Sequence, residues 1–187
     1  MGARRILRGL AFLAPIPLLA FAAPLAAGEA STASGSINVT IVEPIAIQAV
    51  DPLQFGILAV SPSQGGEVTV DPGTGATSFT GGVDGACPSG SGCFARPALF
   101  AVTGEAGRRY RIDAPTSAVA SGGTGGGATL TVSAISVFAS SGSPSSSRGL
   151  LDDAGRDSFR VGGTLSVPAG TRPGIYRAEL AVVVSYD

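Results

Sequence analysis

The two cysteines are the residues whose type and spacing most directly suggest chemistry. Cys87 and Cys93 stand six positions apart in CPSGSGC, and the chain holds no other cysteine. In an exported protein such a pair is expected to form a disulfide. Because the ring is small, the chain-entropy model gives it only about 2.4 kcal/mol of stabilisation. The alternative, a redox or metal-binding pair, is weakened by this spacing and by the absence of histidine from the chain.

Catalytic constellations are hard to assemble from the remaining residues. The chain has no histidine and no lysine, which excludes Ser-His-Asp and Cys-His systems, Ser-Lys dyads and Schiff-base chemistry. Asp152, Asp153 and Asp157 cluster in a polar stretch and offer oxygen ligands of the kind calcium prefers, but their spacing matches no calcium loop. We therefore expect no enzyme, no catalytic residues, no metal and no cofactor.

The first thirty residues have the pattern of a secretory signal peptide. Arg4, Arg5 and Arg8 precede an apolar run that ends in small residues. Cleavage is expected after Ala27 or Ala30. The sequence thus predicts an exported protein, located in the periplasm, at the cell surface or outside the cell.

Residues 31–187 have the length and composition of one domain. After Ala30 the chain has nine arginines against twelve acidic residues, so it lacks the basic surface that nucleic-acid binding requires. Glycine makes up 28 of 187 residues, about twice its usual share of roughly 7%. Together with many Val, Thr and Ser residues, this favours short strands and tight turns.

Alternating apolar residues recur along this domain, and no stretch of it has a convincing helical period. Alternation is expected at 37–41, 45–50, 67–70, 98–104, 108–115, 128–140, 159–170 and 174–187. Residues 98–104 and 108–115 flank GEAG and are expected to form a hairpin. Roughly eight strands separated by turn signals predict an all-β fold, best fitted by a single Ig-like antiparallel β-sandwich.

The last of these stretches, GIYRAELAVVVSYD, predicts a long strand with one buried face. Its apolar face is expected to carry Tyr176, Ala178, Leu180, Val182, Val184 and Tyr186, while its other face carries Arg177, Glu179 and Ser185. Leu180, Val182 and Val184 should point into the core.

Four phrases taken together resemble a known family. They are LQFG, GGEVTVDPGTG, ALFAVTGEAGRRYRI and VGGTLSVPAGTRPGIYRAELAVVVSY. They are similar to the secreted bacterial family named domain of unknown function 4402, over nearly all of residues 31–187. The family resembles spore-coat-U proteins and fimbrial subunits, which implies a pilin-like Ig fold.

The resemblance to fimbrial subunits implies a role in assembly for the last residues of the sequence. Such subunits have a penultimate Tyr and a Gly fourteen residues from the end, as Tyr186 and Gly174 are here. Their sandwich lacks one strand, which a periplasmic chaperone lends and the next subunit then replaces at an usher. The resemblance thus implies assembly by strand addition, with Ile37, Val39 and Ile41 as the candidate donor strand.

Two other interpretations stay open at this stage. Residues 37–41 could instead be the first strand of a self-complete secreted or surface domain of unknown role. A small outer-membrane β-barrel is a further alternative, although 6% aromatic residues and no tryptophan supply little for its aromatic girdles.

Overall fold

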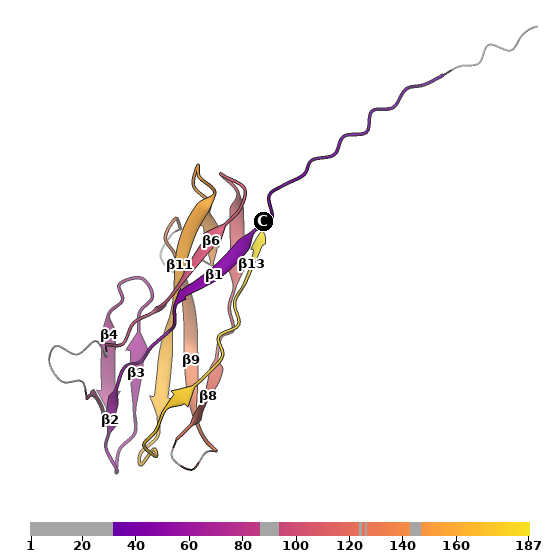
Figure 1. The fold of residues 1–187 in the computed structure, drawn as a ribbon. Helices are drawn as coiled ribbons and strands as arrows, with labels where there is room; N and C mark the ends of the chain where they lie inside the picture. The colour runs from indigo at the N-terminus through magenta and orange to yellow at the C-terminus, as the bar shows by residue number, and fades with distance from the viewer. Residues whose placement is uncertain (1–31, 87–93, 124, 126, 143–146) are drawn as a thin grey trace, which may run out of the picture. The chain divides into compact units, whose positions relative to one another are not determined.

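Thirteen strands make up the regular structure of the part of the chain that the computed structural model describes. This part covers residues 32–86, 94–123, 125, 127–142 and 147–187 (Figure 1). The strands are β1 (Ala46–Asp51), β2 (Leu58–Val60), β3 (Gly66–Val70), β4 (Thr77–Gly81), β5 (Val83–Gly85), β6 (Ala98–Thr103), β7 (Arg109–Asp113), β8 (Ala118–Gly122), β9 (Ala128–Ala139), β10 (Arg148–Leu150), β11 (Arg156–Val167), β12 (Tyr176–Arg177) and β13 (Val183–Tyr186). Every pairing between them is antiparallel, so the predicted all-β fold is confirmed.

The larger sheet is organised around β11. Its strands follow the order β1-β6-β11-β9-β8-β12, and β3 pairs with both β11 and β4. One edge of β11 pairs with β6 through residues 156–161 and then with β3 through residues 163–167, while β9 occupies the other edge. The single long strand β11 thus connects the part of the sheet that contains β6 with the part that contains β3.

Gly162 allows β11 to change partner at this point. A Cβ atom on Gly162 would lie 2.2 Å from the carbonyl oxygen of Val70 and 2.7 Å from the Pro72 ring. No side chain fits in that space, so the chain leaving β3 can approach β11 closely only where glycine stands. The Gly-Gly pair of the sequence therefore serves the architecture of the sheet.

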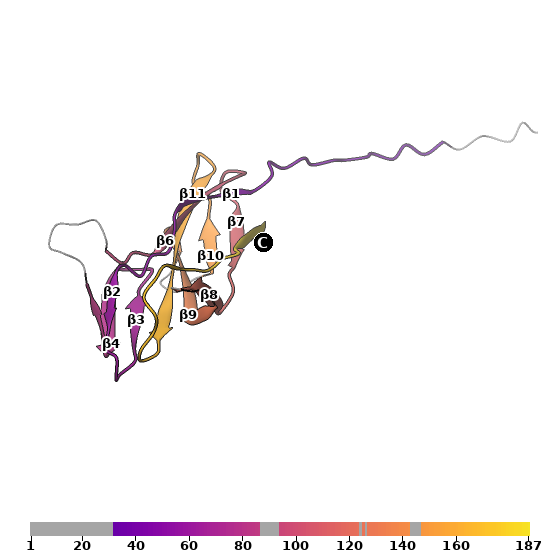
Figure 2. The same cartoon turned by 60° about the horizontal axis from the view of Figure 1, so that its bottom comes forward.

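A second sheet, in the order β10-β7-β13, packs against the first and completes a sandwich (Figure 2). Between them lies the first core cluster, built from buried residues of β6, β7, β9 and β11 and from Leu151. The rings of Phe100 and Phe159 stack there with centroids 5.0 Å apart. β6 and β7 belong to different sheets, so the predicted hairpin is wrong: the GEAG stretch crosses between sheets instead.

A bulge in β9 separates this cluster from a second one. Ala134 has a positive φ of 48°, and the register with β11 shifts between Gly162 and Thr164. Before the bulge Leu130 and Val132 are buried, and after it Val137 and Ala139 are buried. The phase of the alternation therefore changes within one strand, as a β-bulge requires. Leu130 and Val132 belong to the second core cluster and Val137 and Ala139 to the first.

Candidate functional site

The residues from 174 to 187, called here the terminal segment, do not form the continuous strand that their alternation predicts. β12 pairs with β8 in the larger sheet, and β13 pairs with β7 in the smaller one. Residues 178–182 between them belong to no strand. The physical reason lies in the segment of the same chain that runs beside these residues. There β7 ends at Asp113 and β8 begins at Ala118, and Pro115 between them has no N–H to donate. The strand pairing of the terminal segment is therefore interrupted at the same place as the strand between β7 and β8.

The expected alternation of side chains nevertheless holds along most of the terminal segment. Leu180, Val182, Val184 and Tyr186 pack against the first core cluster while remaining partly exposed, whereas Val183 is 61% exposed. Tyr176 packs against the second cluster. Ala178 departs from the prediction, because it is exposed in the stretch without strand pairing. Gly174 is also exposed and has a φ of 149°.

The terminal segment runs beside β1, and we call the boundary between them the terminal seam. Ile45, just before β1, and Ile47 within it pack on the first core cluster and are half-buried, like the seam residues of the terminal segment. β1 and β13 lie side by side (Figure 1), yet no ladder joins them in the described part of the chain. The seam is thus lined from both of its sides by partly buried apolar side chains that pack on the first core cluster.

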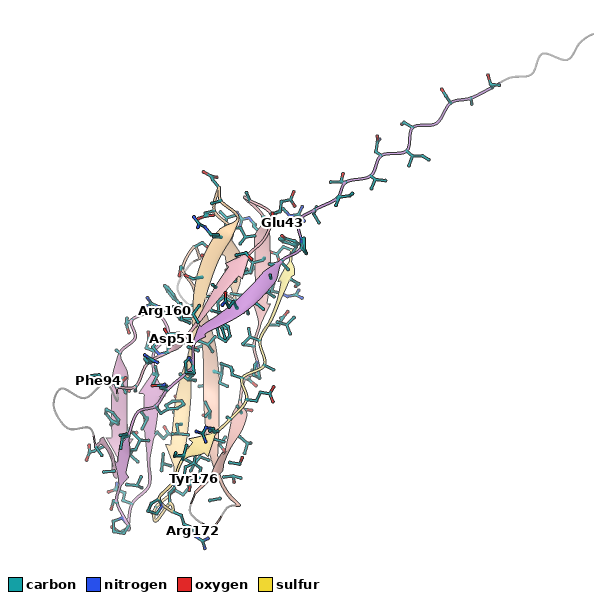
Figure 3. All side chains as sticks on the ribbon, viewed as in Figure 1. Glu43, Asp51, Phe94, Arg160, Arg172 and Tyr176 are labelled. Carbon is teal, nitrogen blue, oxygen red and sulfur yellow. The ribbon has the colours of Figure 1, made fainter. Side chains whose placement is uncertain are left out.

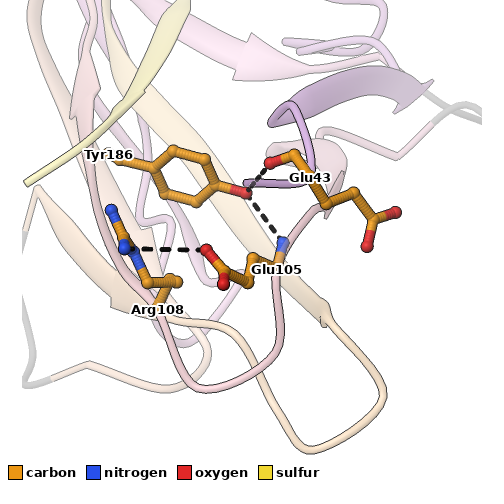
Figure 4. Close-up of polar contacts among 4 residues, drawn as sticks. All are labelled: Glu43, Glu105, Arg108 and Tyr186. Carbon is orange, nitrogen blue, oxygen red and sulfur yellow. Dashed lines mark hydrogen bonds and ion pairs between the residues drawn. The ribbon is translucent and has the colours of Figure 1, made fainter. Parts of the chain in front are cut away.

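Tyr186 ties the two sides of the terminal seam together at one end (Figure 4). Its hydroxyl donates to the carbonyl oxygen of Glu43 at 2.7 Å and accepts from the backbone N–H of Glu105 at 2.7 Å. The Arg108 guanidinium lies 5.0 Å from the centre of the Tyr186 ring and 3.6 Å from the Glu105 carboxylate. A Cβ atom on Gly104 would stand 2.3 Å from the tyrosine oxygen, so glycine is required there.

Tyr176 makes a similar contact at the other end of the terminal segment. Its hydroxyl donates to the carbonyl oxygen of Arg172 at 2.8 Å. Gly123, at a positive φ of 82°, passes so close that a Cβ atom would lie 2.7 Å from this hydroxyl. The two tyrosines therefore each hold the backbone of a charged residue, Glu43 in one case and Arg172 in the other.

The candidate donor residues are strongly exposed. Ile37, Val39 and Ile41 expose 91%, 77% and 91% of their surface, and residues 32–45 contain no strand. The expectation that 37–41 forms a strand by itself is therefore wrong; the first strand of the described chain is β1 at 46–51. Exposed apolar side chains at alternate positions have the form that a strand-addition partner needs.

The acidic stretch serves local structure. Asp152 accepts hydrogen bonds from the backbone N–H groups of Ala154 and Arg156, and Asp157 accepts from the hydroxyls of Tyr110 and Ser141. Burial, and then the bond to Asp157, raise the pKa of Tyr110 far above its usual value. Asp152, Arg156 and Asp157 line an open hollow of about 400 Å³. Among the residues that the structure describes, no group of three or more His, Cys, Asp or Glu is placed to hold a metal.

Several predictions fall outside the described residues. Cys87 and Cys93 are among these, and so are residues 1–30, the expected signal peptide. Both expectations stay predictions. In the described ranges, no helix has the length and apolar character needed to cross a membrane.

Comparison with known proteins places the chain in a family. Residues 45–186 match the model of a domain of unknown function, DUF4402, and the chain belongs to this family. No curated protein and no solved structure matches the chain. The match begins one residue before β1 and ends with the last residue of β13, so it includes both sides of the terminal seam except for the stretch before Ile45.

Sequence reasoning identified both tyrosines but missed what they bind. Tyr186 and Glu43 are 143 positions apart, and Tyr186 and Glu105 are 81 apart. Alternation reports which face a side chain occupies and carries no information about such distant partners. The one local signal was available at Tyr176, whose hydroxyl reaches back only four residues to Arg172.

Proposed function

We propose that this protein is an exported structural subunit that assembles with copies of itself by β-strand addition. The observation that carries the proposal is the terminal seam, where two neighbouring edges share an apolar core and no ladder. Unpaired edges over a partly exposed core are sites at which another strand pairs. A fimbrial-type role fits this arrangement and an enzymatic role does not.

The occupant that fits best is the segment carrying Ile37, Val39 and Ile41 from a second copy. Its apolar residues stand two apart, and so do Leu180, Val182 and Val184 on the seam. In an extended strand, residues two apart lie on one face, so three donor side chains would face the seam together. Burying each would contribute roughly 1.5–3 kcal/mol. Backbone hydrogen bonds to residues 178–182 would add to this.

Such a subunit needs protection before it assembles. An exposed apolar seam with open edges promotes aggregation. The proposal therefore includes a periplasmic chaperone that covers the seam after export, and an usher at which the next copy replaces it.

The alternative is a self-complete surface domain. It is favoured by β1, which already pairs with β6 inside the chain, so the sandwich is not missing its first strand. In that case the seam is an ordinary sheet edge, and residues 37–41 have no acceptor.

Electrophoresis in SDS without heating distinguishes the strand-addition subunit from the self-complete domain. Protein comprising residues 31–187, purified from the periplasm, should give a ladder of SDS-resistant species that collapse to monomer on boiling, because exchanged strands are kinetically trapped. A variant with Ile37, Val39 and Ile41 all changed to Asp should give no ladder. A second variant, with Asn38 and Thr40 changed to Asp, adds charge to the opposite face of the segment and should retain it.

A peptide supplies the complementary test. The sequence SGSINVTIVE should bind the triple Asp variant, whose own seam is intact, and a peptide with the three apolar residues changed to Asp should not. Monomers that remain stable at high concentration and ignore the added peptide would overturn the proposal in favour of the self-complete domain.

A further inference from the structure

The larger sheet has an open edge at β4, away from the terminal seam. β4 pairs with β3 on one side and has no ladder with any other strand of the described chain. It lies at the outer margin of the sheet, where Figure 3 draws its side chains as sticks. The free side of β4 is therefore a second place where the sheet can be extended.

The ladder with β3 determines which backbone groups of β4 point to this free side. In the turn that precedes β4, the N–H of Asp71 donates to the carbonyl oxygen of Ala76. Hydrogen-bonded pairs alternate with non-bonded pairs in an antiparallel ladder, so the residues of β4 that bond to β3 are those at positions 78 and 80. The N–H and C=O groups of Thr77 and Phe79 therefore point away from β3, toward the open edge.

β4 lacks the features by which natural proteins protect an exposed edge. Its sequence, TSFTG, contains no charged residue and no proline. β10 and β12, which also stand at sheet edges, are shorter and carry Arg148 and Arg177. β4 is thus an edge that a further strand can join without meeting a charge.

The sequence of β4 is suited to pairing with β4 of a second copy. In an antiparallel pair centred on Phe79, this residue faces its counterpart, and Ser78 faces Thr80 on each side of it. The outward backbone groups of the two Phe79 residues then bond to each other, and no like charges meet. Aromatic residues that face each other across two strands also stabilise the pair.

The Phe79 side chain is placed to take part in this contact. It is 39% exposed. A Cβ atom on Gly85 would lie 3.3 Å from its ring, so the ring rests against the backbone of β5. A second copy would cover the part of the ring that the chain itself leaves exposed.

We propose that two copies of this chain associate through β4, in an antiparallel register centred on Phe79, so that the larger sheet continues from one copy into the other. The contact uses the same strand on both copies around a two-fold axis, so it closes as a dimer. It goes beyond the proposed function, because it involves neither the terminal seam nor residues 37–41. In an assembled protein it joins neighbouring chains side by side.

Sedimentation velocity on a chain without the donor residues isolates this contact. Protein comprising residues 31–187, with Ile37, Val39 and Ile41 changed to Asp, should show a concentration-dependent equilibrium between monomer and dimer. Changing Ser78 and Thr80, both exposed, to Lys in this parent chain creates two facing pairs of like charge. The dimer dissociation constant should then rise by about 2- to 30-fold. Ser78→Lys with Thr80→Glu instead creates two facing pairs of opposite charge and should dimerise at least as tightly as the parent chain.

Thr129→Lys with Thr131→Lys is the matched control. These two exposed residues lie on β9, in the interior of the same sheet, so the variant gains the same charge and should keep the parent dissociation constant. A dimer that follows this pattern supports the inference.

Three results would overturn the inference. The first is a parent chain that sediments as monomer up to about 1 mM. The second is a dimer that the two lysines on β4 weaken no more than the two on β9. The third is a dimer that the Lys–Glu variant weakens as much as the variant with two lysines on β4. Strand addition is tested separately by the SDS-resistant ladder, so either proposal can fail without the other.

Discussion

The two halves of the terminal segment deal differently with the same problem, which is how to end a sheet over an apolar core. At the β12 end, backbone pairing with β8 covers the second cluster. At the β13 end, the segment pairs with β7 on one side only, and its other edge faces β1 without a ladder. One hydroxyl, that of Tyr186, spans that gap. Both strands are thus edge strands that pair on one side only, and they differ in that the free edge of β13 lies beside β1 across the terminal seam.

The largest effect is expected from placing a charge in the seam. Val182→Asp would bring a carboxylate among partly buried apolar side chains without a partner, and should lower the free energy of unfolding by about 3 kcal/mol or more. Val183→Asp is the matched control, because Val183 is 61% exposed and points the other way. Urea denaturation of the two variants measures the difference. Equal midpoints would show that the faces assigned to Val182 and Val183 of the terminal segment are wrong.

The two tyrosine hydroxyls should rank next. Tyr186→Phe removes two hydrogen bonds and leaves the Glu105 N–H without its partner, which should cost about 1–3 kcal/mol. Tyr176→Phe removes one, at an exposed site, and should cost less. Thermal unfolding of both variants would settle the order. A larger loss of stability for Tyr176→Phe would contradict the view that the two hydrogen bonds of the Tyr186 hydroxyl stabilise the protein more than the one of Tyr176.

The burial of Tyr110 in the first core cluster, in contrast to the partly exposed residues of the seam, predicts that stability depends on pH in the alkaline range. Tyr110, fully buried, has a raised pKa, so it stays protonated in the folded protein above pH 10, where the unfolded chain releases that proton. Its contribution is therefore fully present below about pH 10 and falls by about 1.4 kcal/mol per pH unit above it.

Ultraviolet absorbance of phenolate provides the measurement. Of the three tyrosines, Tyr110 should ionise only when the protein unfolds, and Tyr110→Phe should abolish that late component. Ionisation of Tyr110 before the protein unfolds would place Tyr110 outside the core.

The sequence predicted the fold through its long strands and failed where strands change partner. Alternation located β6, β7, β9 and β11, because apolar residues at alternate positions of each strand face the core. It did not predict the bulge in β9, where the buried face changes phase between Val132 and Val137. The split of the terminal segment was not predictable in this way, because its cause is Pro115 in a neighbouring chain segment some sixty residues away.

The candidate site was predictable only in part for a related reason. Leu180, Val182, Val184 and Tyr186 followed from local alternation, and Ile37, Val39 and Ile41 from the same signal. Glu43, Gly104, Glu105 and Arg108 join the site through contacts distant in sequence. Nothing in their local pattern separates them from ordinary loop residues.

The smallest effect is expected at Asp71, in the turn between β3 and β4 and distant in register from the seam. Its carboxylate accepts from the backbone N–H of Thr74 at 2.7 Å and from the Thr74 hydroxyl at 3.0 Å. These bonds favour the charged form and lower its pKa below the usual 3.8. Stability from this group is therefore present above pH 3.8 and is lost as the pH falls through the lowered pKa. The side chain is exposed, so the contribution is small.

Asp71→Ala should thus reduce the urea midpoint slightly at pH 7, and its difference from wild type should shrink as the pH falls below 3.8 and the wild-type carboxylate becomes protonated. Asp71→Asn keeps an acceptor and loses the charge, so its urea midpoint at pH 7 should fall between those of wild type and Asp71→Ala. Because this turn lies outside the terminal seam, both variants should give the same SDS-resistant ladder as wild type. If Asp71→Ala reduced the ladder as strongly as the change of Ile37, Val39 and Ile41 to Asp, assembly would be following overall stability, and the seam would lose its support as the site of strand addition.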